Sequence, residues 1–580
     1  MIISASWGAD TRYEAEDAIV DENSVELVAD AEASGGSYIN MKEGNLSFTV
    51  TAATAGFYTL WVTYSQPFDE NGKIQNLTVN GASKGQISFP VCSTFISVKG
   101  SAKIKLSAGS NTIGIVHSWG WVNIDYIELT PYVETPFTVS GNLVSPNPSE
   151  NALKMYGFLR EHFQKNVVSG VMTSTVMRTD GKYTPNPLEE QIEVAYIIES
   201  SGKAPALLGL DFIHGSGKES DNEWHIGYTA ATLSLAEAIF SQGGVPAYCW
   251  HWKDPLKKVE AFYSPSSGNT PFADFNLKKA FTDTITCEQF NTASEEYKAV
   301  VADIDIVAGY LKKLADKNIP VLWRPLHEAS GKWFWWGYSG AKPCVALYRL
   351  MFDRIVNHHG LNNLIWVWTT DEASDALDWY PGDEYVDIIG RDYYYYPPEA
   401  NHGSLVASFE KVKDIFGGKK IIALSENGSL PHPDSMVADG AGWSYFMPWN
   451  NEFTMDLWAD HNKAADWNVT MNHEYVITLD EMPGWDRYTP PDPSAIRRPA
   501  SDSPPRFTYR ENRIGFDRYP AAASVELLDI HGRQIATVNR NQMAAGMQHL
   551  NMGNVAKGLY LVRFRSSKGT TLATSPMIIR

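Results

Sequence analysis

The chain has 580 residues, of which 44% are hydrophobic, 20% charged and 12% aromatic. This length exceeds what one hydrophobic core usually organises, so we expect two or three domains, and the composition excludes a largely disordered chain. With 48 basic and 67 acidic residues the net charge is −19, which argues against nucleic acid and anionic membranes as partners and predicts a neutral one.

The cysteines and the start of the chain say little about compartment. Cys92, Cys249, Cys287 and Cys344 are too sparse for a disulfide framework and form no metal-binding pattern, which leaves their disulfide status open. No uninterrupted apolar stretch is long enough to span a bilayer, so we expect no membrane insertion. The first residues lack a basic region followed by an apolar one, so a secreted form would need a signal peptide that this sequence does not contain.

The pattern of polar and apolar residues changes once along the first 480 residues. From about 11 to 133, short runs such as 57–62 alternate polar and apolar residues between Gly and Asn turns, which is typical of a β-sandwich. From about 150 to 480, strand-like apolar runs such as 320–323 alternate with amphipathic helical stretches such as 342–356. This alternation indicates parallel strands with helical crossovers, and at this size it predicts a (β/α)8 barrel in an α/β protein.

A segment rich in Pro, Ser and Asp separates the barrel from a third region. Residues 489–505 have the composition of an extended linker. The remaining residues again show short strands with turns, which favours a small β-sandwich. The predicted domains are 1–140, 141–490 and 507–580, with 491–506 as the linker.

Two glutamates follow strand-like runs in the predicted barrel. They are Glu328 and Glu426, and barrel chemistry occurs where strands end at the C-terminal face. Cleavage of a glycosidic bond needs one carboxylic acid to protonate the leaving oxygen and one carboxylate to stabilise or attack the anomeric carbon. The aromatic run 333–336 supplies flat apolar faces of the kind that stack on sugars. On the pattern alone, surface carboxylates and core tryptophans remain the alternative.

This part of the chain resembles glycoside hydrolase family 26, whose best-known members are β-mannanases. Three strand-end motifs occur in the family's order: 323–328 followed by Trp333 and Trp336-Gly337, then 390–394, then 425–428. The resemblance implies a retaining double displacement with Glu328 as acid/base and Glu426 as nucleophile, and no cofactor for catalysis. The two carboxyl groups should then lie about 5 to 5.5 Å apart. The implied substrates are plant mannan polysaccharides (mannan, glucomannan or galactomannan) and mannooligosaccharides, cleaved by an endo-acting enzyme.

The same resemblance implies which barrel side chains contact sugars. Trp333 is expected to stack at the sugar preceding the scissile bond, and Tyr394 to hydrogen-bond the nucleophile. Packing in the core is the alternative for several of the aromatic residues. Asn450 stands where relatives carry an arginine, which leaves the binding of distal or galactose-substituted sugars open. The full predicted set is His251, Trp252, His327, Trp333, Trp336, Asp392, Tyr394 and Trp449.

The first region resembles carbohydrate-binding module family 35 through residues 13–17 and 119–129. Residues two apart in a strand project to one side, so Glu14 and Glu16 can bind the same cation. Asp125, on a neighbouring strand, can complete the oxygen ligands of that cation. With the resemblance, these three residues favour a structural calcium ion. Trp119 is the candidate sugar platform and Asn123 its hydrogen-bonding partner. We expect that removing residues 1–140 leaves hydrolysis of soluble mannooligosaccharides nearly unchanged and weakens action on insoluble mannan.

The last region resembles the sorting domains recognised by the type IX secretion system, through residues 525–533 and 556–560. This implies that the C-terminal domain binds secretion machinery and that the protein is secreted or associated with the cell surface. Another sugar-binding sandwich is the alternative for this domain. For the whole chain, the alternatives are a family 26 enzyme that acts on mixed-linked β-glucan or β-1,3-xylan, and a non-catalytic carbohydrate-binding protein. Intact Glu328 and Glu426 count against the non-catalytic reading.

Overall fold

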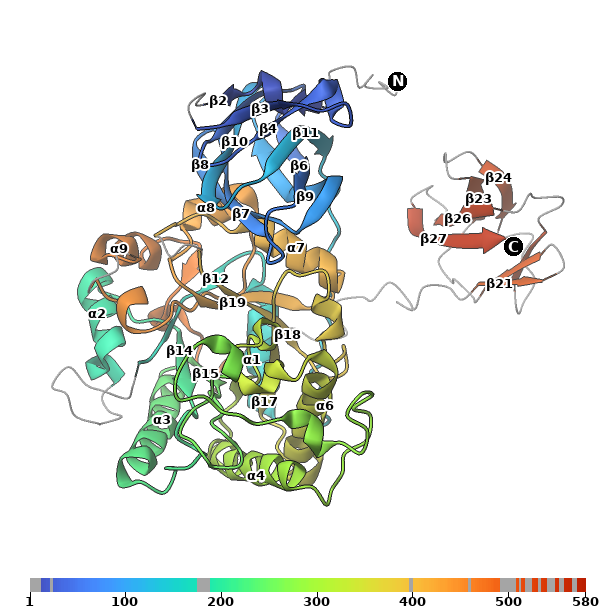
Figure 1. The fold of residues 1–580 in the computed structure, drawn as a ribbon. Coiled ribbons are helices and arrows are strands. Elements are labelled where there is room, and N and C mark those ends of the chain that lie inside the picture. The colour runs from blue at the N-terminus through green and yellow to red at the C-terminus, as the bar shows by residue number, and fades with distance from the viewer. Residues whose placement is uncertain are drawn as a thin grey trace. The chain divides into compact units, whose positions relative to one another are not determined.

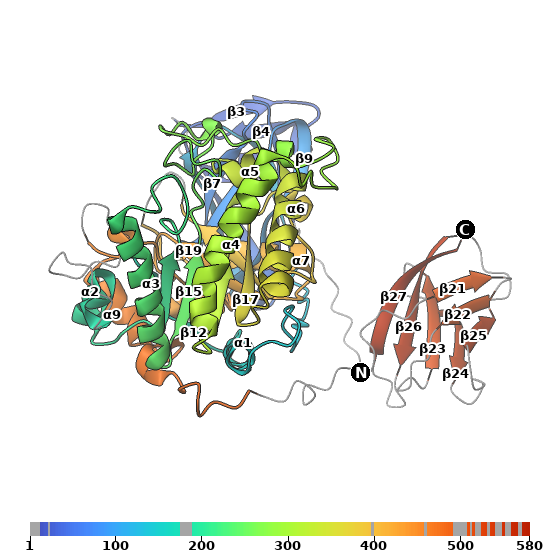
Figure 2. The same cartoon turned by 90° about the horizontal axis from the view of Figure 1, so that it is seen from below.

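The computed structural model describes residues 12–20, 24–174, 188–395, 400–456 and 461–490, together with seven strands between 507 and 579. The chain divides into two compact units, 1–490 and 491–580. The first unit consists of an antiparallel β-sandwich and an α/β barrel, as Figures 1 and 2 show. Within the described ranges, no helix is both long and apolar enough to cross a membrane.

Two antiparallel sheets form the N-terminal module, which is blue in Figure 1. In β5 (Leu46–Ala52) every second residue is buried, so the alternating sequence places one side of the strand in the module's core. One sheet contains β1 (Arg12–Glu14), β3 (Glu26–Ala29), β4 (Ser37–Asn40), β6 (Gly56–Gln66), β9 (Cys92–Leu106) and β11 (Asn123–Pro131). The other contains β2 (Ile19–Val20), β5, β7 (Lys73–Val79), β8 (Ala82–Phe89) and β10 (Gly109–Trp119). The predicted β-sandwich is confirmed.

Seven parallel strands pair in sequence order and form most of the barrel wall. They are β13 (Gly170–Met172), β14 (Leu207–Asp211), β15 (Val245–Cys249), β16 (Val321–Arg324), β17 (Leu364–Thr370), β18 (Ile388–Tyr393) and β19 (Ile421–Asn427). Residues 445–448 take the eighth place, because they bridge Val168 on one side and Asn427 on the other in parallel. A short pair, β12 (Val167–Val168) and β20 (Val476–Ile477), lies at the base of this junction. The predicted (β/α)8 barrel is confirmed.

Helices follow the strands and cover the outside of the barrel. The predicted helix at 342–356 is α6 (Ala341–Phe352), which a π-helical turn, Asp353–His358, extends. The other helices are α1 (Glu150–His162), α2 (Ile192–Ser201), α3 (Glu223–Ser241), α4 (Glu295–Ala315), α5 (Trp335–Tyr338), α7 (Val406–Phe416), α8 (Pro433–Asp439) and α9 (Ala464–Met471). Local sequence explains where α4 begins, because the Ser294 side chain accepts a hydrogen bond from the Tyr297 amide.

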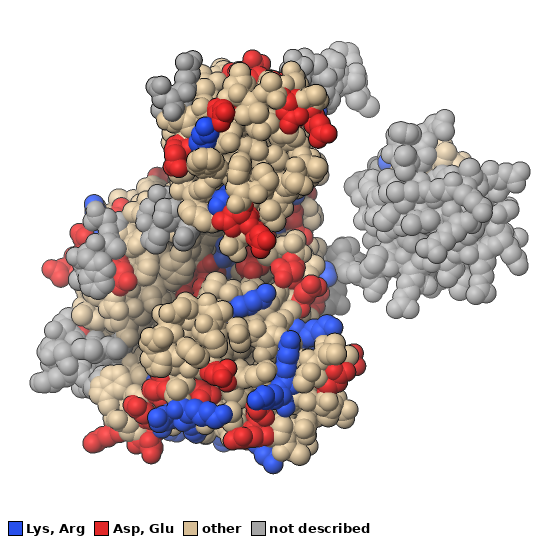
Figure 3. All heavy atoms as spheres, in the orientation of Figure 1, with Lys and Arg blue, Asp and Glu red and all other residues tan. Residues whose placement is uncertain are grey.

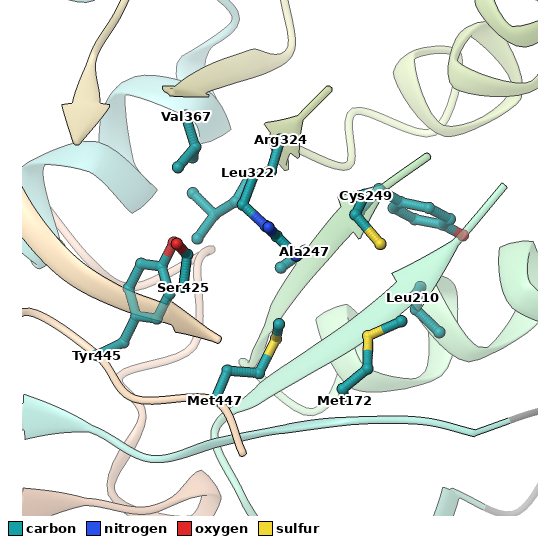
Figure 4. Close-up of a pocket in the computed structure, with 11 residues that line it drawn as sticks. Met172, Leu210, Ala247, Cys249, Leu322, Arg324, Val367, Ser425, Tyr445 and Met447 are labelled. Carbon is teal, nitrogen blue, oxygen red and sulfur yellow. The ribbon is translucent and has the colours of Figure 1, made fainter. Parts of the chain in front are cut away.

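The barrel interior is a packed core rather than a channel. Every residue of β16, β17 and β19 is buried, as expected for parallel strands covered on both sides. Figure 4 shows Leu322, Arg324 and Met447 among the side chains around a small internal cavity. Its volume is about 10 Å³, which is no more than one water molecule needs. The strands therefore form a rigid base for the residues at their ends.

The second unit contains two antiparallel sheets. One consists of β21 (Phe507–Arg510), β22 (Arg513–Phe516) and β25 (Gln548–Asn551). The other has the order β24 (Gln534–Asn539), β23 (Ser524–Asp529), β26 (Gly558–Arg565) and β27 (Thr571–Ile579). This all-β arrangement agrees with the small sandwich predicted after the linker.

Candidate active site

Glu328 lies in a tight turn directly after β16. Leu326 and Glu328 both adopt left-handed backbone conformations with φ of 53°, which non-glycine residues rarely do. The Trp336 indole holds the turn by donating to the His327 carbonyl at 2.9 Å. Such strain persists only where the surroundings impose it, and it is concentrated at functional sites. The turn thus directs the Glu328 side chain at the C-terminal mouth of the barrel.

Glu426 lies near the end of β19 and accepts hydrogen bonds at both carboxylate oxygens. The Arg324 guanidinium donates to Oε1, and the Tyr394 hydroxyl donates to Oε2 at 3.0 Å. Arg324 also donates to Asp392 Oδ2 at 2.7 Å, and the Ser425 hydroxyl donates to Asp392 Oδ1 at 2.6 Å. Asp392 is 5% exposed, with a protein donor at each oxygen. The structure therefore gives Asp392 a role in holding Arg324 beside Glu426, whereas we had predicted a substrate contact.

Glu328, Asp392 and Glu426 form one carboxylate cluster. An oxygen from each lies within 4.8 Å of an oxygen from each of the others. An inverting glycosidase needs about 6.5 to 9.5 Å between its two carboxyl groups to admit a water, whereas a retaining one needs about 5 to 5.5 Å. Although such clusters can hold a metal ion, the buried Arg324 guanidinium already supplies a cation here. The spacing is that of the retaining class.

Burial shifts the pKa of both glutamates upward. It raises the pKa of Glu328 to about 7, and the nearby negative charge of Asp392 adds to the effect. It also raises the pKa of Glu426, to about 8, although Arg324 acts in the opposite direction. The negative charge of Glu328 also contributes to the rise at Glu426. A guanidinium donates to Glu426 and only a neutral indole to Glu328, so hydrogen bonding favours the negative charge on Glu426.

A buried chain of polar groups lies beside the acid/base turn. Asp211, at the end of β14, is 2.6 Å from Nδ1 of His251, and His251 Nε2 is 3.2 Å from His327 Nε2. Burial and the neighbouring His251 hold the pKa of His327 well below its usual value. His327 is only 1% exposed, so its ring supports the turn from inside the protein rather than touching a sugar as predicted. His251 is 9% exposed and lies between His327 and Trp449.

The predicted aromatic contacts divide into exposed and buried residues. Trp333 is 39% exposed, and its indole donates to Glu328 Oε2 at 3.0 Å, so its ring flanks the acid/base. Trp449 is partly buried, with its ring 5.7 Å from that of His251. In contrast, Trp252 and Trp336 are both 0% exposed. Trp252 stacks on Trp250 and Trp336 donates to the turn backbone, so neither ring can stack on a sugar and both predictions are corrected.

Two functional residues escaped the sequence-based prediction. Arg324 is fully buried and bridges the two carboxylates of β18 and β19, while Asp211 orients His251. A signal for both existed, because each is a charged residue at the C-terminal end of an otherwise apolar strand.

In the N-terminal module, the predicted metal residues approach one another through Ser34. Its amide donates to Asp125 Oδ1 at 2.9 Å and its hydroxyl donates to Glu14 Oε1 at 2.9 Å. Glu16 lies nearby, since a Cβ atom at Gly35 would be 2.5 Å from its Oε1. Glu14 ends β1, but Glu16 belongs to a 3-10 turn, so the argument from strand periodicity was wrong. Burial raises the pKa of Asp125 to about 6, and Glu14 and Glu16 contribute.

The predicted sugar-binding residues of the module are less accessible than a neighbouring pair. Asn123 is 5% exposed and donates to the Ser65 hydroxyl at 3.0 Å, so it is not available at the surface. The Lys73 ammonium lies 4.0 Å from the centre of the Trp119 ring and covers one of its faces. Trp121 and Phe68 are 42% and 43% exposed, with ring centres 6.1 Å apart. These two rings form the more open apolar surface.

Figure 3 shows Lys and Arg side chains together with Asp and Glu side chains on one face of the molecule, most of which is neither basic nor acidic.

A barrel with two close carboxyl groups at its C-terminal mouth, one buried and one partly buried, is the arrangement expected of a retaining glycoside hydrolase. Residues 144–481 match glycosyl hydrolase family 26, residues 11–132 match carbohydrate binding module family 35, and residues 512–580 match a secretion system C-terminal sorting domain. The chain therefore belongs to glycosyl hydrolase family 26 and is a glycoside hydrolase, which confirms the three resemblances found in the sequence.

Characterised relatives agree with this membership. The mannan endo-1,4-beta-mannosidase of Thermothelomyces thermophilus is 32% identical over 480 residues, which cover 82% of this chain and 91% of that protein. The Podospora anserina GH26-CBM35 β-(1,4)-mannanase is 31% identical, with a TM-score of 0.52 over 82% of this chain and 98% of that one. The β-mannanase of a symbiotic protist of the termite Reticulitermes speratus, complexed with gluco-manno-oligosaccharide, is 40% identical. Its TM-score is 0.54 over 60% of this chain and 99% of that one.

Proposed function

We propose that this protein is an endo-acting, retaining β-1,4-mannanase that hydrolyses mannan, glucomannan or galactomannan. The observation that carries the proposal is the carboxylate cluster, in which oxygens of Glu328 and Glu426 lie within 4.8 Å at the barrel mouth. The relatives described above act on mannan by name, and they share both the barrel and, in two cases, most of the chain's length. A non-catalytic binding protein would have no need for two adjacent glutamates with raised pKa values, one of them in a strained turn.

The proposed reaction has two steps that use the same pair. In the first, Glu426 attacks the anomeric carbon while Glu328 transfers its proton to the glycosidic oxygen, so the leaving sugar departs as an alcohol and a glycosyl ester forms. In the second, Glu328 takes a proton from a water molecule that attacks the same carbon and displaces Glu426. The product keeps the β configuration. Esterification removes the charge of Glu426, which lowers the pKa of Glu328 between the two steps.

The surroundings divide the work of binding and orientation. Arg324 and Tyr394 hold the Glu426 carboxylate ionised and correctly placed, because both donate hydrogen bonds to it. Trp333 is the proposed stacking surface next to the scissile bond, since its ring is exposed and bonded to Glu328. Trp449 and His251 are the proposed contacts for sugars further along the chain.

The flanking parts are proposed to place the enzyme on its substrate outside the cell. Trp121 and Phe68 are the proposed sugar-binding surface of the module, beside the predicted Trp119. A calcium ion at Glu14, Glu16 and Asp125 is also proposed, and it is supported by the Oε2 atoms of both glutamates, which are buried without a hydrogen-bond partner among the described residues. The C-terminal unit is the proposed signal for secretion or attachment to the cell surface through a secretion system.

The test is product analysis with a panel of polysaccharides. The full chain is incubated with galactomannan, glucomannan, mixed-linked β-glucan and β-1,3-xylan, and the products are separated by chromatography. Internal cleavage of the first two, with newly formed ends initially in the β configuration by proton NMR, is the expected result. Release of products only from β-glucan or xylan, or initial α products, would contradict the proposal.

A further inference from the structure

The N-terminal module and the barrel meet at a face that contains buried ion pairs. Lys84 of β8 places its ammonium 2.8 Å from each oxygen of Asp439, the last residue of α8, and the two side chains are only 12% and 3% exposed. Lys103 of β9 lies 3.4 Å from Glu410 of α7, where both side chains are also buried. Removing one partner of a buried pair leaves an uncompensated charge and is costly. In Figure 1 the module lies directly against α7 and α8.

The same face continues into the loops that follow β18 and β19. Ser83 of β8 accepts a hydrogen bond from the Asn401 side chain at 2.9 Å, and the Asn401 amide donates to the Ser429 hydroxyl at 3.0 Å. Asn401 belongs to the loop between β18 and α7, and Ser429 is three residues beyond Glu426. The Ser429 carbonyl in turn accepts from the side chain of Asn427, the last residue of β19. A short chain of hydrogen bonds thus connects the module to the residue next to Glu426.

The backbone of β8 also lies over the end of β18. A Cβ atom at Gly85 would be 4.0 Å from the Tyr393 hydroxyl and 4.0 Å from Ala407 Cβ. Tyr393 immediately precedes Tyr394, the donor to Glu426, and its carbonyl accepts from the Gly428 amide at 3.1 Å. Strand β8 therefore lies next to the side chain of Tyr393, the residue before Tyr394.

Buried charge fixes the barrel side of this face as well. Asp439 accepts from the Ser404 hydroxyl at 2.5 Å in addition to Lys84, and the Ser404 carbonyl accepts from the Trp443 indole at 3.1 Å. Without Lys84, the buried Asp439 carboxylate that accepts from Ser404 would lose this cation. The module thus supplies a charge that the barrel does not supply for itself at this position.

We propose that the N-terminal module is a positioning element of the active site, in which β8 holds the loop after β18, which begins with Tyr394, and the loop after β19, the strand that carries Glu426. This proposal rests on the proposed roles of those two residues. It changes the expectation from sequence that the module acts as a tether alone. A tether raises the local concentration of enzyme on an insoluble substrate and leaves kcat on a soluble one unchanged. A positioning element changes kcat on soluble substrates, because small displacements of catalytic groups are costly.

The test uses the full chain and a soluble aryl β-mannobioside. Lys84→Met removes the buried cation, Ser83→Ala removes one hydrogen bond to the loop, and Lys105→Met, at an exposed position of β9, is the control. We expect Lys84→Met to lower kcat on the order of 10-fold with a smaller change in KM, since misplacement by about 1 Å can cost about 100-fold. Ser83→Ala should lower kcat several-fold, and Lys84→Arg should restore most of the activity.

Melting temperatures are measured for every variant, and the assays are run well below the lowest of them. Lys105→Met sets the reference for kcat and for the alkaline limb of the kcat pH profile. If Lys84→Met and Ser83→Ala are both folded and match this reference in both quantities, the proposal is wrong. It is equally wrong if Lys84→Met loses activity on insoluble mannan alone, since that result describes a tether. The activity of the wild-type chain on mannan is measured before any variant is compared. If the wild-type chain cleaves no mannan, the proposed function is refuted instead.

Discussion

Replacing Arg324 by Met removes the cation that donates directly to Glu426. Arg324 is fully buried and donates to both Glu426 and Asp392, so the variant leaves a cluster of three carboxyl groups without a counter-ion. Breaking a buried ion pair by removing one partner costs about 3 to 5 kcal/mol. We expect a loss of that size in the free energy of unfolding at neutral pH, together with a large loss of activity.

The pH dependence of this loss follows from the direction of the pKa shift. Arg324 is the strongest influence that lowers the pKa of Glu426, so its removal raises that pKa further above the ordinary value. A carboxyl group with a raised pKa in the folded protein destabilises the fold above its unfolded pKa of about 4.3, because the unfolded chain ionises more readily. Because the pKa of Glu426 is already about 8 with Arg324 in place, the part of the loss that depends on this group should develop as the pH rises through about 8 and should be absent near pH 4. Protonation of Glu426 also removes the nucleophile.

Arg354→Met is the matched control. Arg354 makes a similar two-point contact with Asp305 at 2.7 Å for each bond, but both side chains are about one-third exposed and lie on the outer helices. Exposed pairs contribute about 0 to 1 kcal/mol. Denaturant unfolding at pH 4.5 and 9, with kcat/KM measured over the same range, distinguishes the two. The reasoning is refuted if Arg324→Met is destabilised no more than Arg354→Met, or if its loss of stability is the same at both pH values.

Three further predictions concern separate features. Asp392→Asn removes a negative charge that raises the pKa of Glu328, so the alkaline limb of the kcat/KM profile should move to lower pH; a shift to higher pH would contradict this. Glu328→Ala should slow mannan cleavage far more than cleavage of an aryl mannoside with a good leaving group, since only the poor leaving group needs protonation, and equal slowing would exclude Glu328 as the acid. A chelator should lower the melting temperature of the module by removing calcium, and calorimetry that shows no change would remove calcium from the proposal.

The sequence predicted that Glu328 and Glu426 lie at strand ends, and the structure places both there, because strand ends are local features. Glu328 and Glu426 each follow a run of apolar residues, and the parallel strands β16 and β19 bring their ends to one face. The eighth barrel position was harder to foresee, since residues 445–448 contribute only isolated bridges and have no strand-like pattern.

Burial of individual aromatic residues could not be read from the sequence. In the run 333–336, Trp333 is exposed and Trp336 is buried. This difference in burial depends on the left-handed turn at Glu328 and on the packing of Trp336 against His327, which the sequence does not show. Arg324 was missed for a related reason. Its role depends on the carboxylates of Asp392 and Glu426, which lie on strands much later in the sequence. Local sequence patterns indicate where strands end, whereas contacts between residues of different strands can be seen only in the folded structure.

The central claim is that Glu426 forms the covalent bond to the sugar, and trapping that bond is its most direct test. The enzyme is incubated with a 2-deoxy-2-fluoro mannosyl fluoride. The fluorine at C2 slows both steps, whereas the anomeric fluoride is a good leaving group, so the glycosyl-enzyme accumulates. The digested protein is then analysed by mass spectrometry. We predict one labelled peptide with the sugar on Glu426, and no label in Glu426→Ala. A label on Glu328 or Asp392, or an active enzyme that never carries a label, would contradict the account.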